Sequence, residues 1–82
     1  MKIFVLTVSQ VYDYEELELV VRAFKKEEDA LKDFAWWKEN EFKDLPQGWV
    51  IDDDQEGHYS MCAEGDWTRG HVEVSVTSVE LN

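Results

Sequence analysis

The sequence predicts an α+β fold: a two-layer sandwich with the element order ββαββ, in which one helix packs on a mainly antiparallel, four-stranded sheet. Two observations support this prediction. Segments on both sides of the chain centre alternate apolar and polar residues with a period of two, which is typical of strands. Between them, residues 27–43 place apolar side chains at helical spacing. The 82 residues suffice for one domain, which we expect to span residues 1–82.

The predicted helix begins with three acidic residues at positions 27–29, which complement the positive end of the helix dipole. It is expected to end before Pro46. Its apolar stripe consists of Ala30, Leu31, Phe34, Trp37 and Phe42. Trp36 points about 100° away from this stripe. We therefore expect Trp36 either to be covered by the segment that follows the helix or to contact a partner.

The first two strands are predicted over residues 3–11 and 16–24. Pairing Val8 with Leu19 gives both strands a common apolar face, because opposed residues of an antiparallel pair share a face. That face consists of Phe4, Leu6, Val8, Leu17, Leu19, Val21 and Ala23. The helix is expected to lie on it. The opposite face then carries Val5, Val20 and Phe24 among polar residues.

After the helix, residues 49–51 form a short apolar segment, either an edge strand or a connector, and residues 52–57 an acidic turn. A second hairpin is expected from residues 58–66 and 71–81, with Asp66 opposite His71. This register gathers Tyr59, Met61, Ala63, Val72, Val74 and Val76 on one face. The alternation slips after Val76, which predicts a β-bulge near Thr77 or Ser78.

The order of these features is similar to that of known small domains. The strand Ile3–Leu6 leads into a turn at residues 12–15, residues 24–30 open the helix, and residues 65–67 precede a last Val-rich strand. This pattern resembles small uncharacterised domains of unknown function from bacteria and their phages or mobile elements. The resemblance implies the hairpin–helix–hairpin architecture, and it implies no activity.

The charge balance favours some classes of partner and disfavours others. Nineteen acidic residues against eight basic ones give a net charge of −11. This charge repels a phosphate backbone, so direct nucleic-acid binding is disfavoured, whereas a basic protein partner is favoured. A single cysteine, Cys62, excludes an intramolecular disulfide. No apolar run reaches the ~18 residues that a membrane span requires, so we expect a cytoplasmic protein without membrane association.

A metal site is one alternative. The predicted second hairpin carries side chains of metal-binding types at Glu64, Asp66, His71 and Glu73, which are cross-strand neighbours in the predicted register. A hydrated polar face with Asp66 paired to His71 explains the same residues, so no metal or cofactor is expected. The acidic segment 52–57 matches the first half of a calcium-binding loop, but the closing glutamate is missing.

No catalytic motif is present in the sequence, and Cys62 with His58 or His71 lacks any group that would orient a thiol–base pair. We therefore predict a non-catalytic acidic interaction module that forms a homodimer or binds a basic protein. Its contact surface is expected on the open sheet face, with Val5, Val20 and Phe24, or around Trp36. The alternatives are a DNA-mimic inhibitor from a mobile element and a metal-binding protein that uses carboxylates and histidine.

Overall fold

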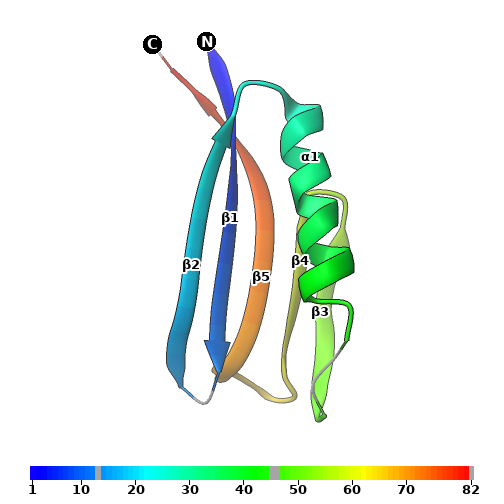
Figure 1. The fold of residues 1–82 in the computed structure, drawn as a ribbon. Coiled ribbons are helices and arrows are strands. Elements are labelled where there is room, and N and C mark those ends of the chain that lie inside the picture. Colours follow the sequence, from blue (N-terminus) through cyan, green and yellow to red (C-terminus); the bar gives the residue numbers. More distant parts are fainter. Residues whose placement is uncertain (13, 45–46, 82) are drawn as a thin grey trace.

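The computed structural model describes residues 1–12, 14–44 and 47–81, and for residues 16–18 it describes the backbone alone. The described residues form one antiparallel sheet of five strands with a helix on one face (Figure 1). The elements are β1 (Lys2–Tyr12), β2 (Glu15–Phe24), α1 (Glu27–Trp36), a π-helical turn (Trp37–Glu41), β3 (Trp49–Gln55), β4 (His58–Ala63) and β5 (Asp66–Glu80). The strand order is β2-β1-β5-β4-β3.

The predicted α+β class, with one helix on an antiparallel sheet, is confirmed, but the count of four strands is wrong. The fifth strand is β3, which the sequence analysis divided between an apolar segment and an acidic turn. Trp49 pairs with Ala63 and Gln55 pairs with His58, so the acidic residues 52–54 belong to the edge strand. Side chains on an edge strand can reach water, so three consecutive aspartates are tolerated there.

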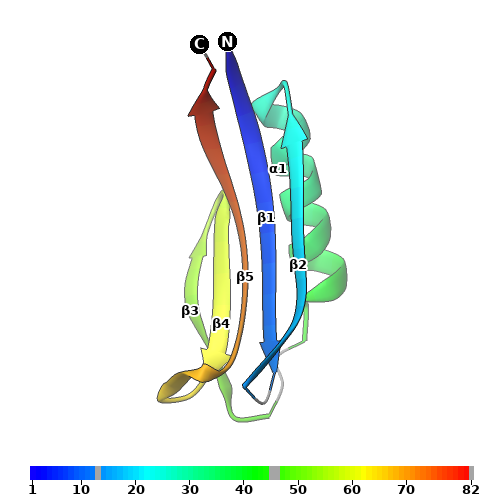
Figure 2. The same ribbon diagram turned by 90° about the vertical axis from the view of Figure 1, so that its left-hand side faces the viewer.

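The helix lies on one side of the sheet only, as Figure 2 shows. Between the two layers lies the core, which consists of Leu6, Val8, Phe34, Trp37, Phe42, Tyr59, Met61, Val72 and Val74. Every one of these residues belongs to the apolar faces that the sequence analysis assigned to the interior. The faces of β1, α1, β4 and β5 are therefore predicted correctly.

The register of β2 against β1 differs from the prediction. At the turn, Tyr12 pairs with Glu15, as the predicted register requires. The register then shifts by one residue next to Gln10, so that Val8 lies opposite Val20 instead of Leu19. A one-residue shift transfers every following side chain to the other face of the sheet. The predicted placement of β2 is therefore wrong from this shift onward.

The shift places Val20 and Phe24 on the helix side, where both pack against the core. Their predicted place on the open face is wrong. Arg22 also faces the helix: its guanidinium binds the Asp33 carboxylate at 3.1 Å and lies 5.9 Å from the centre of the Trp37 ring. The helix therefore stabilises the shifted register through one ion pair, one cation–π contact and two apolar side chains.

The helix ends in a π-helical turn. The Phe42 amide donates to the Trp37 carbonyl oxygen at 3.0 Å, and the two rings stack with their centres 5.9 Å apart. Both side chains are buried. The π-helical turn thus brings Phe42, the last apolar residue of the predicted helical stripe, into the core.

The second hairpin turns earlier than predicted. Cys62, rather than Asp66, lies opposite His71, and Ala63 pairs with Asp66. The tight turn falls at residues 64–65, where Gly65 adopts φ +76°, a conformation that glycine accepts without strain. β5 pairs with β1 without a register shift from residue 70 to residue 80, so the predicted bulge near Thr77 or Ser78 is wrong.

Candidate protein-interaction surface

The sheet face opposite the helix carries a continuous group of uncharged side chains on β1, β2 and β5. Strand alternation and the pairing registers place ten residues in it: Ile3, Val5, Thr7, Ser9, Leu19, Val21, Ala23, Ser75, Thr77 and Val79. We call these residues the neutral patch. Each of them is at least partly exposed, and none carries a charge.

The most exposed apolar residues of the neutral patch lie on the outer strand. Leu19 and Val21 on β2 are each 61% exposed, and Val79 on β5 is 41% exposed. In this chain 33% of residues are charged, so a charge-free region of ten residues departs clearly from the rest of the sequence. Six of its ten residues are apolar, and contiguous exposed apolar surface marks interaction sites in soluble proteins.

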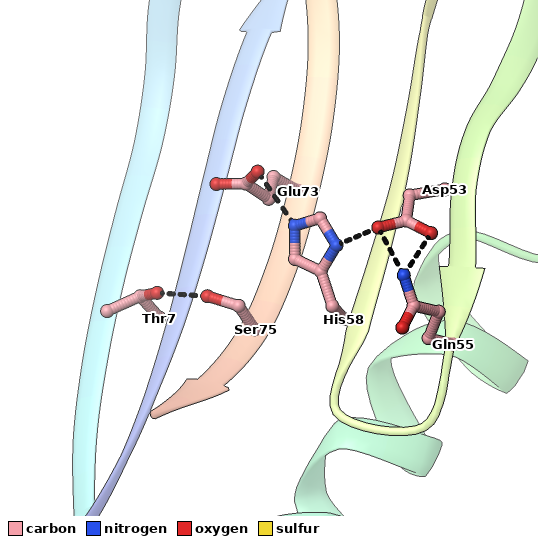
Figure 3. Close-up of polar contacts among 6 residues, drawn as sticks. All are labelled: Thr7, Asp53, Gln55, His58, Glu73 and Ser75. Carbon is pink, nitrogen blue, oxygen red and sulfur yellow. Dashed lines mark hydrogen bonds and ion pairs between the residues drawn. The ribbon is translucent and has the colours of Figure 1, made fainter. Parts of the chain in front are cut away.

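A polar network adjoins the neutral patch on the same face. The His58 ring lies between two carboxylates: its Nδ1 is 2.5 Å from Asp53 Oδ2 and its Nε2 is 3.0 Å from Glu73 Oε2 (Figure 3). Gln55 Nε2 donates to both oxygens of the Asp53 carboxylate, at 2.8 and 3.0 Å. These contacts join β3, β4 and β5. Glu73 pairs in register with Ser9, so the network ends at the border of the neutral patch.

These contacts shift two pKa values in opposite directions. Hydrogen bonds to Glu73 and Asp53 raise the pKa of His58, and they outweigh the opposing effect of desolvation. Hydrogen bonds from Gln55 and His58 lower the pKa of Asp53. The ring therefore keeps its proton to a higher pH than a free histidine, and the carboxylate stays ionised to a lower pH than a free aspartate.

This network predicts a specific pH dependence of stability. A raised pKa of His58 in the folded state contributes stability that is complete below the unfolded value of about 6.5. That stability is lost as the pH rises through the folded pKa. The lowered pKa of Asp53 contributes stability that is lost as the pH falls below about 3.9 and through its folded value. Urea unfolding from pH 4 to pH 9 should therefore show a decline above about pH 6.5 that His58→Asn removes.

His71→Asn is the matched control, since His71 is the other of the two histidines. Its Nδ1 lies 2.9 Å from the Trp67 carbonyl oxygen, away from the network. This variant should keep the decline above about pH 6.5. Identical pH profiles for His58→Asn and the unaltered protein would contradict the assignment.

The structure does not bring the four candidate metal ligands together. These are Glu64, Asp66, His71 and Glu73. Asp66 accepts hydrogen bonds from the Thr68 hydroxyl and the Arg69 amide, His71 stacks on Trp67 at 4.0 Å between ring centres, and Glu73 binds His58. The predicted pairing of Asp66 with His71 is replaced by these contacts. Across residues 1–12, 14–44 and 47–81, no group of three or more His, Cys, Asp or Glu side chains is arranged to hold a metal ion.

Cys62 is a partly buried free thiol on the open face. Desolvation, and secondarily the charge of Asp52, raises the pKa of Cys62. A raised pKa keeps the thiol protonated, and the thiolate is the nucleophilic form. His58, the nearer candidate base in sequence, has both ring nitrogens bound to carboxylates.

Trp36 lies on α1, on the opposite side of the molecule from the neutral patch. It is 48% exposed and meets Trp37 edge to face, with the ring centres 5.4 Å apart. Trp49, which belongs to the segment that was expected to cover it, stacks on Tyr12. The two predicted contact regions, the sheet face and Trp36, are therefore separate surfaces.

A hollow of about 440 Å³ lies between the helix and the β3–β4 turn. Leu31, Phe34 and Ala35 form its apolar wall. Lys38 forms an ion pair with Asp54, and both residues line the hollow. The Lys38 ammonium also lies 5.2 Å from the centre of the Tyr59 ring. The Lys38 ammonium, the cation that lines the hollow, thus already contacts Asp54 and the Tyr59 ring.

The sequence analysis missed Leu19 and Val21 as surface residues because it placed both in the core. The open face retains Val5 from the predicted contact residues, while Val20 and Phe24 turn to the helix. No local signal could have corrected this. The face with Leu19 and Val21 is more apolar in sequence than the face with Arg22, so alternation alone favours the wrong side.

Comparisons of this chain with models of protein families, with curated proteins and with solved structures find no match. The resemblance to bacterial and phage domains therefore stays a prediction. Among the described residues, no helix is long and apolar enough to cross a membrane.

Proposed function

We propose that this protein is a non-catalytic interaction module that contacts another protein molecule through the neutral patch. One observation carries the proposal: ten neighbouring residues without a charge lie at least partly exposed on a chain whose net charge is −11. The cores of protein–protein interfaces are depleted of charged residues, because burying an unpaired charge is expensive. The acidic residues outside the neutral patch favour solubility, so the charge and the patch serve different purposes.

The Asp53–His58–Glu73 network supports this proposal because it stiffens the adjoining half of the same face. Its hydrogen bonds tie β3, β4 and β5 together, and the Thr7 and Ser75 hydroxyls, 2.9 Å apart, tie β1 to β5 within the neutral patch. A surface held in place before association loses less conformational entropy when it binds. The neutral patch is therefore better suited to a contact than a mobile loop of similar composition.

Site-specific photo-crosslinking tests the proposal. A photoreactive phenylalanine derivative replaces Val21 in the neutral patch or, as the control, Ile51 on β3, which is 48% exposed and lies outside it. Both variants are irradiated as purified protein and in an extract of the source cells. Covalent protein adducts are expected from position 21 and not from position 51. Absence of adducts from position 21 under both conditions would contradict the proposal.

A further inference from the structure

Building on the proposed function, we infer that the partner is a second copy of this chain, which pairs antiparallel along the outer edge of β2 and continues the sheet. The strand order places β2 and β3 at the two edges. An edge strand presents a row of backbone N–H and C=O groups to any strand that can approach. None of the described elements pairs with the outer edge of β2.

The two edges differ in how well they are protected. β3 is seven residues long, has a register shift between Ile51 and Asp53, and carries three consecutive aspartates. Irregular pairing and charge are the features that prevent edge-to-edge association. β2 is ten residues long; its register shift and its three glutamates, at positions 15, 16 and 18, lie at the end next to the turn, and its pairing with β1 is continuous from Glu18 to Phe24. Arg22, the one charged residue from Leu19 to Phe24, is bound to Asp33 on the helix side. From Leu19 to Phe24, β2 is therefore the less protected of the two edges.

Leu19 and Val21, the two exposed apolar residues at the centre of β2, are self-complementary. A twofold axis at Val20 places Leu19 of each copy directly opposite Val21 of the other on the open face. Cross-strand apolar pairs stabilise such a contact. The neutral patches of the two copies then become one continuous surface, and no charge is buried at its centre.

Charge favours a second copy over a basic partner at this edge. A basic protein is attracted to carboxylates, and β2 carries none from Leu19 to Phe24, since its three glutamates lie at the end next to the turn. Two copies, each with a net charge of −11, repel one another at long range instead. Added salt screens this repulsion, so association of two copies should strengthen with salt, whereas binding to a basic partner should weaken.

The experiment combines solution mass with amide hydrogen exchange. Light scattering should detect a species of twice the 9.7 kDa chain mass, more abundant at 500 mM than at 50 mM sodium chloride. On association, those amides of β2 that point away from β1 should exchange more slowly. Val21→Lys should weaken association about tenfold or more, because like charges then meet near the twofold axis.

Val79→Lys is the matched control. Val79 belongs to the neutral patch but lies on β5, two strands from the edge. Pairing along the edge predicts that this variant still associates, whereas stacking of two sheet faces predicts that it does not. Circular dichroism checks that both variants are folded, and Leu19→Lys, at an equally exposed position, replaces Val21→Lys if that variant fails to fold.

The outcomes separate the inference from the proposed function. Loss of the dimer in Val21→Lys, its retention in Val79→Lys and slower exchange of the outward β2 amides support the inference. Loss of the dimer in both variants, without slower exchange of the outward β2 amides, overturns edge pairing and leaves the proposed function standing. The protein could also stay monomeric at both salt concentrations and crosslink through position 21 to a different protein. That result overturns edge pairing and leaves the proposed function standing. A monomer that gives no adduct from position 21 overturns both.

Discussion

Leu6→Ala is expected to lower the free energy of unfolding by about 2–5 kcal/mol. The Leu6 side chain is 0% exposed and belongs to the core between the sheet and the helix. Its removal leaves a cavity that the surrounding strands cannot close, because β1 is held by a neighbouring strand on each side. A small domain has roughly 5–15 kcal/mol of stability, so this loss is a large part of the total. Urea unfolding followed by tryptophan fluorescence measures it.

Leu19→Ala makes the same chemical change at a position that is 61% exposed. At concentrations where the chain is monomeric, its effect should stay within about 0.5 kcal/mol. This comparison tests the register of β2, since pairing Val8 with Leu19 would place both leucines in the core. Equal losses of stability for Leu6→Ala and Leu19→Ala would contradict the register shift.

Gly70→Ala should destabilise the protein by about 1–3 kcal/mol through overpacking. A Cβ atom at residue 70 would lie 2.5 Å from Cζ2 of Trp49 and 3.3 Å from the Val11 carbonyl oxygen. The Trp49 indole cannot move freely, because it stacks on Tyr12 with the ring centres 5.3 Å apart and packs against the core. Either the indole leaves this stack or β5 moves away from β1. Thermal unfolding measures the cost.

A double-mutant cycle identifies the source of this cost. In a Trp49→Ala background the clashing indole is absent, so adding Gly70→Ala should cost much less than it does in the unaltered protein. A near-ultraviolet circular dichroism change in Gly70→Ala alone would show that the indole has left its stack. An unchanged cost in the Trp49→Ala background would mean that the contact with the Val11 carbonyl oxygen is responsible.

Much of the interior could be predicted from alternation alone. Leu6 and Val8 are fully buried, as are Val72 and Val74 on the neighbouring strand. Each of these pairs lies on a strand whose opposite face is more polar, so burial of the apolar face is the only low-energy arrangement. The helical stripe was predictable for the same reason. Its residues Phe34 and Trp37 are buried where the helix meets the sheet.

The site was less predictable because both faces of β2 carry apolar residues. Its alternation is compatible with two registers that differ by one residue, and the turn favours the register in which Val8 pairs with Leu19. The observed shift costs one local irregularity, and it places Arg22 next to Asp33 and packs Phe24 against the core. Those gains come from residues on the helix, which a reading of β2 by itself does not include.

The sequence by itself thus determined the α+β class, the buried faces of β1, α1, β4 and β5, and the strongly acidic character of the protein. Only the tertiary structure decided which face of β2 meets solvent, that the acidic segment after Ile51 is an edge strand, and that His58 joins Asp53 to Glu73. The physical reason is the range of the interactions. Periodicity reports how each segment partitions between water and the interior, whereas register and side-chain networks depend on contacts between segments far apart in the chain.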